Sequence, residues 1–457
     1  MSGSIVIVGA GIAGVAAAYH LAVRHGCRDV KLVEAENPLS MTSDKSTEAY
    51  RNWWPGPDGA MTAYMNRSID LLEELARGSG NRFNMNRRGY LFASADATRA
   101  PWLIEMAELA ARHGGGAARV HGSAATSAYS PAPDAAFDAP LAGADILTDP
   151  ALIRRHFPYL NGNTKVVAHV RRAGWLSAQQ LGMMMLEAAR EAGVRLVRGR
   201  ATRVETRGDR VSGVRVALAA GGEELLAADS AVLASGPLVK EMASLAGLTL
   251  PTFAEPHYKI SWKDSERVVP RDAPMMIWLD PQQLPWHAEE REALAADATT
   301  RWLTEPFPGG AHGRPDGSGS TGTVLALYNY KNEQAEVVFP LPESEHYGEI
   351  TLRGMTTMVP GLQVYLDRGA RPYVDGGYYM KTPDNRPLIG PTPVAGLHLS
   401  CCYSGFGIMA SQAGADLLTA HLLDKPLPSH ADAFALARFS DPVHLARIAT
   451  WGDGGQL

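Results

Sequence analysis

The first 33 residues carry the pattern that most constrains the fold. An apolar run at residues 5–8 meets Gly9, Gly11 and Gly14, which have the spacing G-x-G-x-x-G. A helical pattern and a second apolar run, residues 30–33, follow. Strand, glycine-rich turn, helix and strand in this order are typical of a βαβ unit that binds a dinucleotide. We therefore expect an α/β protein with a Rossmann-like domain at its start.

Each residue of this motif has a physical task. Gly9 allows the tight turn, Gly11 lets the backbone approach a pyrophosphate, and Gly14 lets the helix pack against the strand. The N-terminal end of the helix presents N–H groups and a positive dipole end to the phosphates. Glu34 follows Gly14 by about 20 residues, where an acid hydrogen-bonds a ribose 2′-hydroxyl and disfavours the 2′-phosphate of NADP. The motif alone leaves both NAD and FAD open.

Composition narrows the class of protein. A chain of 457 residues predicts two or three domains, and its net charge of −5 argues against nucleic acid as the main partner. Of only three cysteines, Cys401 and Cys402 are adjacent, so we expect no disulfide framework and a cytoplasmic location. No apolar stretch approaches the ~20 residues of a membrane span, and the initial apolar run is too short for a signal peptide.

The rest of the chain contains segments with helical periodicity and segments with the short alternating pattern of strands. Residues 62–77 and 177–193 have helical spacing, the latter with Ser177 as N-cap, whereas residues 115–145 are rich in Ala, Ser, Pro and Gly and predict a long loop. Between 250 and 375, short alternating segments dominate, namely HYKISW, MMIWL, VLALYNY and QVYLD. They predict an antiparallel sheet inserted into the nucleotide-binding domain.

Two distant segments identify the dinucleotide. One is a strand that ends in small residues, 229–236, and the other comprises TPDNRPLIG (382–390) and GLHLSCCYSGFGIMASQAGADLL (396–418). Together with the N-terminal motif, they resemble the D-amino-acid oxidase-like superfamily of FAD-dependent amine oxidoreductases, in particular its sarcosine oxidase and glycine oxidase branch. The resemblance covers most of the chain. It implies a glutathione-reductase-like FAD-binding domain with an inserted, mostly antiparallel β-sheet substrate domain.

The two domains are expected to share the chain in five segments. The FAD-binding domain takes residues 1–85, 151–240 and 376–457. The substrate domain, with a loop insertion, takes residues 86–150 and 241–375.

The resemblance also assigns the cofactor contacts. Gly405 and Gly407 let backbone amides approach the flavin ring, and the helix that starts near Ile408 aims its positive end at the flavin. In such families the backbone of a valine, here Val204, touches the adenine. The complete set expected to bind the cofactor is Gly9, Gly11, Ile12, Ala13, Gly14, Glu34, Ala35, Ser43, Ser46, Val204, Ser235, Gly236, Gly405, Phe406, Gly407 and Ile408.

The chain departs from the family pattern at one position near the flavin, and it lacks the residues that link FAD covalently in some relatives. Cys402 stands where the family usually has glycine, and we expect it and Cys401 to be small buried residues near the flavin. Gly377 occupies the position of the cysteine that holds FAD covalently in some relatives, and residues 37–54 contain no histidine for another such link. We therefore expect non-covalent FAD, and because the histidines lack metal-ligand spacing such as H-E-x-x-H, we expect no metal.

Arg51 is the principal candidate for substrate binding. It matches the arginine that pairs with the substrate carboxylate in the sarcosine oxidase branch, and a guanidinium binds carboxylate in a bidentate manner. An exposed arginine or a structural salt bridge is the alternative. The second anchor of that branch, a lysine, is replaced by Met409.

Three further residues are candidates for the catalytic site. Tyr378 and Tyr379 lie beside the TPD segment, where relatives place residues over the flavin, although plain packing is equally expected. Lys331 is a candidate for the lysine that assists oxygen reduction in oxidases of the family, and a solvated surface lysine is the alternative.

These residues favour one activity and leave alternatives open. The favoured reaction moves a hydride from the carbon next to an amine to flavin N5, giving an imine that hydrolyses, and O2 reoxidises the flavin. The partners are then an amine or amino acid and O2 or another acceptor. The alternatives are a dehydrogenase with a non-oxygen acceptor, a 2-hydroxy acid oxidoreductase, and a flavin-binding assembly or interaction protein without turnover.

Overall fold

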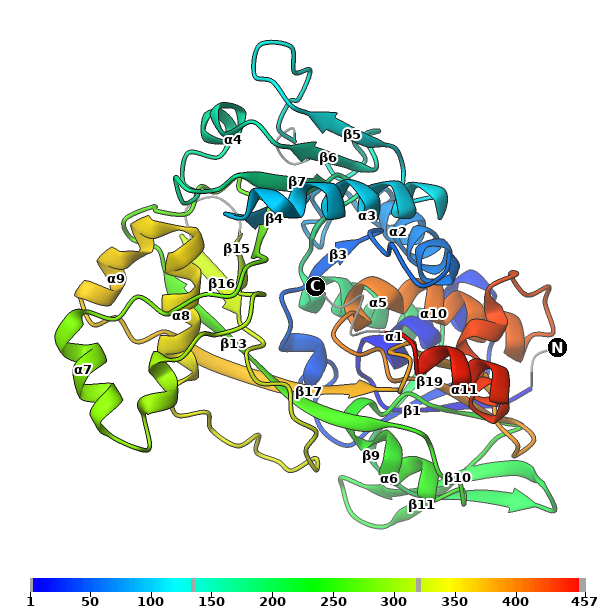
Figure 1. Ribbon diagram of the computed structural model, residues 1–457. Helices are drawn as coiled ribbons and strands as arrows, with labels where there is room; N and C mark the ends of the chain where they lie inside the picture. Colours follow the sequence, from blue (N-terminus) through cyan, green and yellow to red (C-terminus); the bar gives the residue numbers. More distant parts are fainter. Residues whose placement is uncertain (1–2, 133–135, 318–321, 452–457) are drawn as a thin grey trace.

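The computed structural model describes residues 3–132, 136–317 and 322–451 and contains two large sheets. We name them the cofactor sheet, with strand order β11-β10-β9-β2-β1-β12-β19-β18, and the substrate sheet, with strand order β17-β13-β16-β15-β14-β4-β7-β6-β5. In Figure 1, the cofactor sheet lies at the lower right, and the substrate sheet extends from the top toward the helices α7, α8 and α9 at the left. The expected combination of a Rossmann-like domain and an inserted sheet domain is confirmed.

The cofactor sheet has a parallel centre, since β9, β2, β1, β12 and β19 pair in parallel in this order. Its strands are β1 (Ile5–Val8), β2 (Val30–Glu34), β9 (Arg195–Arg207), β10 (Arg210–Leu218), β11 (Glu223–Ala227), β12 (Ser230–Leu233), β18 (Leu388–Pro391) and β19 (Leu397–Cys401). Successive residues of β1 face opposite sides and all are buried. Ile5 and Ile7 pack on the side of helices α1, α5 and α10, whereas Val6 and Val8 pack on the other side with the valines of β9 and β10.

The substrate sheet is mostly antiparallel, with parallel pairs only at β14–β4 and β5–β6 among the described residues. Its strands are β4 (Tyr90–Ser94), β5 (Ala118–His121), β6 (Ala144–Leu147), β7 (Val166–Val170), β13 (Phe253–Lys263), β14 (Met275–Trp278), β15 (His312–Asp316), β16 (Thr323–Leu327) and β17 (Tyr373–Lys381). A separate pair joins β3 (Ala49–Arg51) to β8 (Ala173–Trp175).

The α-helices cover both sheets. They are α1 (Ile12–Tyr19), α2 (Ala60–Ser79), α3 (Ala100–Arg112), α4 (Pro150–His156), α5 (Ala178–Glu191), α6 (Val239–Ser244), α7 (Ala288–Ala296), α8 (Tyr347–Met358), α9 (Gln363–Asp367), α10 (Gly407–Leu422) and α11 (Pro442–Ile448). The Ser177 side chain caps α5 as expected, by accepting a hydrogen bond from Gln180 N. No helix within the described ranges is long and apolar enough to cross a membrane.

Three local predictions differ from the structure. The QVYLD segment forms the short helix α9, because a five-residue run of strand-forming residues carries too little signal to exclude a helix. The segment 115–145 includes strand β5 and the first residues of β6, and residues 133–135 within it lie outside the described part. Residues 194–197 and 201–206, whose apolar pattern predicts two short strands, belong largely to one continuous strand, β9.

Two strands of the substrate sheet lie within or across segments expected in the FAD-binding domain. Strand β7 belongs to the substrate sheet although it lies within the segment 151–240, which we expected in the FAD-binding domain. Strand β17 crosses the expected boundary at 375 and pairs with β13 over nine residues. The physical reason is that hydrogen bonds to neighbouring strands determine the sheet to which a strand belongs, whereas the position of a strand in the sequence does not. We propose that the chain returns to the cofactor domain at α5 and, finally, at β18.

Candidate cofactor cleft and substrate pocket

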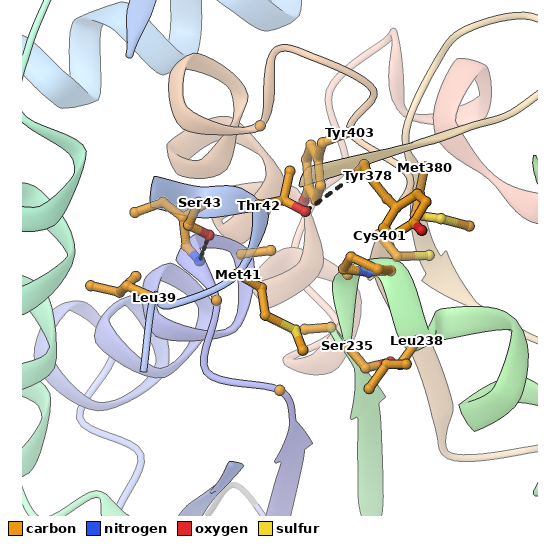
Figure 2. A pocket seen from close by; sticks show the side chains of 18 of the residues that line it. Leu39, Met41, Thr42, Ser43, Ser235, Leu238, Tyr378, Met380, Cys401 and Tyr403 are labelled. Carbon is orange, nitrogen blue, oxygen red and sulfur yellow. Dashed lines mark hydrogen bonds between the residues drawn. The ribbon is translucent and has the colours of Figure 1, made fainter. Parts of the chain in front are cut away.

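A cavity of about 370 Å³, here called the cofactor cleft, opens at the ends of β1, β2 and β12. This is the edge of a parallel sheet at which dinucleotides bind. Figure 2 shows the loop that carries Leu39, Met41 and Ser43 on one side of the cleft and Tyr378 and Cys401 on the other. Thirteen of the expected cofactor residues line it, namely Gly9, Gly11, Ile12, Ala13, Glu34, Ala35, Ser43, Ser46, Ser235, Gly236, Gly405, Gly407 and Ile408.

The glycines of the first turn leave no space for side chains. Gly9 has a φ of +103°, and a Cβ there would lie 2.6 Å from the carbonyl oxygen of Ala234. A Cβ on Gly14 would lie 1.9 Å from the carbonyl oxygen of Gly9. Gly14 does not line the cleft but allows α1 to pack against the turn, as the motif predicts.

Hydrogen bonds hold the polar groups of the cleft in place. The Glu34 carboxylate accepts from Ala10 N at 2.7 Å and from Glu36 N at 2.8 Å, so each oxygen keeps a further lone pair for a hydroxyl ligand. At the start of α1, Ile12 N donates to Ser43 Oγ at 3.0 Å (Figure 2). The Ser235 hydroxyl is buried at the cleft without a hydrogen-bond partner in the described structure, which suits a polar ligand. The donor and acceptor set fits a dinucleotide.

Two expected cofactor residues lie elsewhere. Val204 is buried in the core of the sheet and does not border the cleft; Gly199, Arg200 and Ala201 are the residues of β9 that do. The prediction chose a position too far along a strand whose length the sequence did not reveal. Phe406 borders the smaller pocket described below instead of the cleft.

The far end of the chain closes the cleft. Gly405, Gly407 and Ile408 line it at the N-terminal end of α10, whose positive dipole end therefore faces the cavity. Cys401 and Cys402 also line it, are both buried, and place their sulfur atoms 3.7 Å apart. Cys402 has a φ of +59°, in the left-handed region that favours glycine, so the glycine of the expected family pattern would suit this position.

A second cavity of about 60 Å³, here called the substrate pocket, adjoins the cleft. Ser46, Tyr379, Gly405 and Ile408 border both cavities, so they form a shared wall. The residues that border only the smaller cavity are Thr47, Ala49, Arg51, Tyr90, Met275, Ile277, His312, Leu327, Asn329, Phe406 and Met409. At ~10–15 Å³ for each water-sized group, the pocket has room for only a few heavy atoms.

Arg51 is buried in this pocket, at the end of β3. Its guanidinium lies 4.8 Å from the ring centre of Trp54 and 5.4 Å from that of Tyr90, and its Nε donates to the Trp53 carbonyl. Burial lowers the pKa of Arg51, and Tyr90 opposes this effect. A cation held in a low-dielectric site attracts an anionic group more strongly than a surface cation does.

A hydrogen-bond network around His257, which was not predicted from the sequence, supports Tyr379 in the wall between the two cavities. His257 stacks on Tyr379 with ring centres 3.9 Å apart. Its ring nitrogens lie 3.0 Å from Asn329 Oδ1 and 3.2 Å from Glu255 Oε2. Glu255 also pairs with Lys381 at 2.6 Å. The only sequence signal was a polar residue within each apolar strand segment, at HYKISW and LYNY.

Tyr378 and Lys331 differ in their positions relative to the two cavities. Tyr378 borders the cofactor cleft, and its hydroxyl contacts the backbone of Val338. Lys331 borders neither cavity: it follows β16 in an exposed segment and pairs with Glu333 at 3.4 Å. The structure therefore places Lys331 away from both cavities, since the chain leaves β16 at Leu327, before this residue. No described lysine borders either cavity.

Comparisons with known proteins agree with this architecture. L-proline dehydrogenase from P. horikoshii superposes with a TM-score of 0.72 at 18% identity, covering 96% of this chain and 98% of that chain. Glycine oxidase from Geobacillus kaustophilus gives 0.71 at 17% identity, covering 95% and 98%. Iminodiacetate oxidase from Chelativorans sp. BNC1 gives 0.67 at 18% identity, covering 94% and 98%. These likenesses establish the fold.

The sequence itself establishes the family. A comparison with curated proteins gives no significant match. The model of the DAO family, described as FAD dependent oxidoreductase, matches residues 4–421 and thus includes both cavities. The chain therefore belongs to the DAO family of FAD-dependent oxidoreductases, and its cofactor is FAD.

Proposed function

We propose that the protein oxidises a small amine or amino acid at the carbon next to nitrogen, giving an imine that hydrolyses. The observation that carries this proposal is a small pocket with a buried arginine, Arg51, that shares a wall with the cofactor cleft. A shared wall brings a bound substrate next to the cofactor, and orientation contributes much of the rate in such reactions.

FAD held by non-covalent contacts would supply the hydride acceptor. Glu34 would accept hydrogen bonds from the adenosine ribose, the first turn would hold the pyrophosphate, and the Gly405–Gly407 turn would lie against the flavin. The N-terminal end of α10 would stabilise negative charge near it. Release of all yellow colour into the supernatant on acid denaturation would support non-covalent binding, and colour in the precipitate would contradict it.

The remaining steps depend on the chain's own side chains. Arg51 holds the substrate carboxylate and fixes its position in the pocket. Met275, Ile277 and Leu327 give the pocket an apolar side that limits water and substrate size. Tyr379, supported by His257, keeps the wall between the two cavities rigid.

The names of similar structures support a substrate of this kind. The three superposed enzymes are named for proline, glycine and iminodiacetate, which are small amino acids with a carboxylate. A pocket of about 60 Å³ favours small substrates, and glycine fits its size better than proline or iminodiacetate does.

The decisive experiment is anaerobic bleaching of the bound flavin. Small N-methyl amino acids, D- and L-amino acids, cyclic amino acids and 2-hydroxy acids are each mixed with the wild-type protein and with Arg51→Met. We expect at least one amino acid to bleach the wild type, with a rate that falls roughly 10- to 100-fold in Arg51→Met because a charge-assisted hydrogen bond is lost. The matched control is Arg24→Met, which removes an exposed pair with Glu74.

The panel also tests the alternatives. Bleaching by 2-hydroxy acids alone would show that the protein oxidises C–O bonds instead of C–N bonds. Bleaching by dithionite alone would indicate a flavin-binding protein without turnover. Either result would overturn the proposal.

The electron acceptor has two candidates. We expected O2, and an oxygen electrode tests this directly with the best amine of the panel. The lack of a described lysine at either cavity favours a second candidate, a dehydrogenase with another acceptor, because a nearby ammonium would stabilise developing superoxide. Reduction of a dye without oxygen uptake would identify the dehydrogenase.

A further inference from the structure

His312, the first residue of β15, borders the substrate pocket and has a defined tautomer. Its Nδ1 lies 2.8 Å from the carbonyl oxygen of Gly310. A carbonyl only accepts hydrogen bonds, so Nδ1 carries the proton. In the neutral ring, Nε2 is then an acceptor that cannot donate.

Nε2 of His312 is available to a ligand. It has no hydrogen-bond partner in the described part of the chain, and it is not among the fully enclosed polar atoms without a partner. The ring is half-buried and borders the pocket. A molecule in the pocket can therefore reach this nitrogen.

The surroundings keep the imidazole neutral. Burial lowers the pKa of His312 to about 4, and electrostatic interactions with the nearby Arg51 and His257 act in the same direction, against the opposing Gly310 carbonyl. Near neutral pH, His312 therefore offers a lone pair instead of a second N–H.

The other polar side chains of the pocket differ from His312. The Tyr90 hydroxyl interacts with Arg51, and Asn329 Oδ1 contacts His257. Hydroxyl groups can donate as well as accept, and Arg51 can only donate. Among the described side-chain nitrogens and oxygens of the pocket, Nε2 of His312 thus stands out as the unoccupied group that only accepts.

We propose that His312 is a catalytic residue that accepts a hydrogen bond, through Nε2, from the N–H of the substrate amine. The inference rests on the proposed function, with Arg51 holding the carboxylate of the same molecule. It also defines the substrate class. Primary and secondary amines keep an N–H in the neutral, reactive form, whereas neutral tertiary amines have none and would leave Nε2 unpaired.

Two isomeric amino acids test the assignment at constant composition. N-ethylglycine has an N–H in its neutral form, and N,N-dimethylglycine does not. Anaerobic flavin reduction by each is measured in the wild type, in His312→Leu and in His287→Leu, a control that makes the same substitution at an exposed histidine outside both cavities. Binding of acetate, followed by the change in the flavin spectrum, reports the carboxylate site without turnover.

The expected result is a change in selectivity. The wild type should prefer N-ethylglycine on the order of 10- to 100-fold, because a pocket built around an acceptor rejects the isomer that lacks the donor. The preference should fall to a few-fold in His312→Leu and persist in His287→Leu. Acetate binding should stay within a few-fold in all three.

Failure has two distinguishable forms. If amines reduce the flavin but His312→Leu keeps the wild-type preference, or loses acetate binding in parallel, the role of His312 is refuted and the proposed function stands. If no amine reduces the wild-type flavin, the proposed function itself is refuted, and the role of His312 with it.

Discussion

The cofactor cleft and the substrate pocket are built in different ways. The cleft is formed by backbone and small residues at the ends of adjacent parallel strands, with turns such as Gly9–Gly11 and Gly405–Gly407. The pocket gathers large side chains from β3, β4, β14, β15 and the shared strand β17, including the buried charge of Arg51. The difference teaches that cofactor recognition depends on what the backbone permits, whereas substrate recognition depends on which side chains distant strands bring together.

The largest expected effect concerns the turn that connects β17 of the substrate sheet to β18 of the cofactor sheet. Between β17 and β18, Asp384 is buried and accepts hydrogen bonds from Arg438 at 2.7 and 3.0 Å, with His444 at 3.1 Å. Arg438→Met leaves this carboxylate without its main partner, so the free energy of unfolding should fall by roughly 3–5 kcal/mol. Urea denaturation measures the change. Arg195→Met, which removes an exposed pair with Glu224, should alter stability little.

The same pair gives a prediction for pH. Burial raises the pKa of Asp384, but the hydrogen bond and charge of Arg438 outweigh it and hold the pKa below its ordinary value. A depressed folded pKa contributes stability above the unfolded pKa of about 3.9, and this contribution is lost as the pH falls below that value. The difference between wild type and Arg438→Met should therefore shrink below about pH 4. A constant difference down to pH 3 would show that the cost is one of packing.

The next largest effect is expected from a substitution that disturbs the cofactor cleft and not the substrate pocket. Gly9→Ala places a Cβ 2.6 Å from a backbone oxygen and at a φ of +103°, so FAD affinity should fall by about 30- to 100-fold, equivalent to ~2–3 kcal/mol of backbone strain. Flavin fluorescence titration measures it. Gly80→Ala is the matched control, because Gly80 also has a positive φ, +62°, but open space around it. Equal losses of FAD affinity in both variants would indicate general destabilisation.

The smallest effect is expected from two substitutions in β9 that test which of its residues contact FAD. Ala201 borders the cleft and Val204, three residues along β9, is packed in the core. Ala201→Leu should weaken FAD binding by a few-fold to about tenfold, whereas Val204→Ala should lower stability by ~1–2 kcal/mol and leave FAD affinity nearly unchanged. Calorimetric titration of the apoprotein with FAD distinguishes them. The opposite pattern would return Val204 to the adenine site.

The two regions also differ in how far sequence reveals them. The glycine turn at residues 9–14 acts through local backbone geometry, so its spacing predicted the βαβ unit, whereas the turn at residues 405–407 was assigned by family resemblance. Arg51 followed from family resemblance. His312 and Asn329 could not be predicted, since they meet Arg51 only through the pairing of β15 and β16 beside β14. Strand pairing depends on long-range contacts that periodicity does not specify.

The wall shared by the two cavities has a consequence for changing the enzyme. A substitution at Ser46, Tyr379, Gly405 or Ile408 alters both cavities at once, so these four positions are constrained by two ligands. Met275, Ile277 and Leu327 meet only the smaller cavity. Libraries restricted to these three positions should yield variants with new substrate ranges that still load FAD, and natural divergence of substrate choice in close relatives is expected to concentrate there as well.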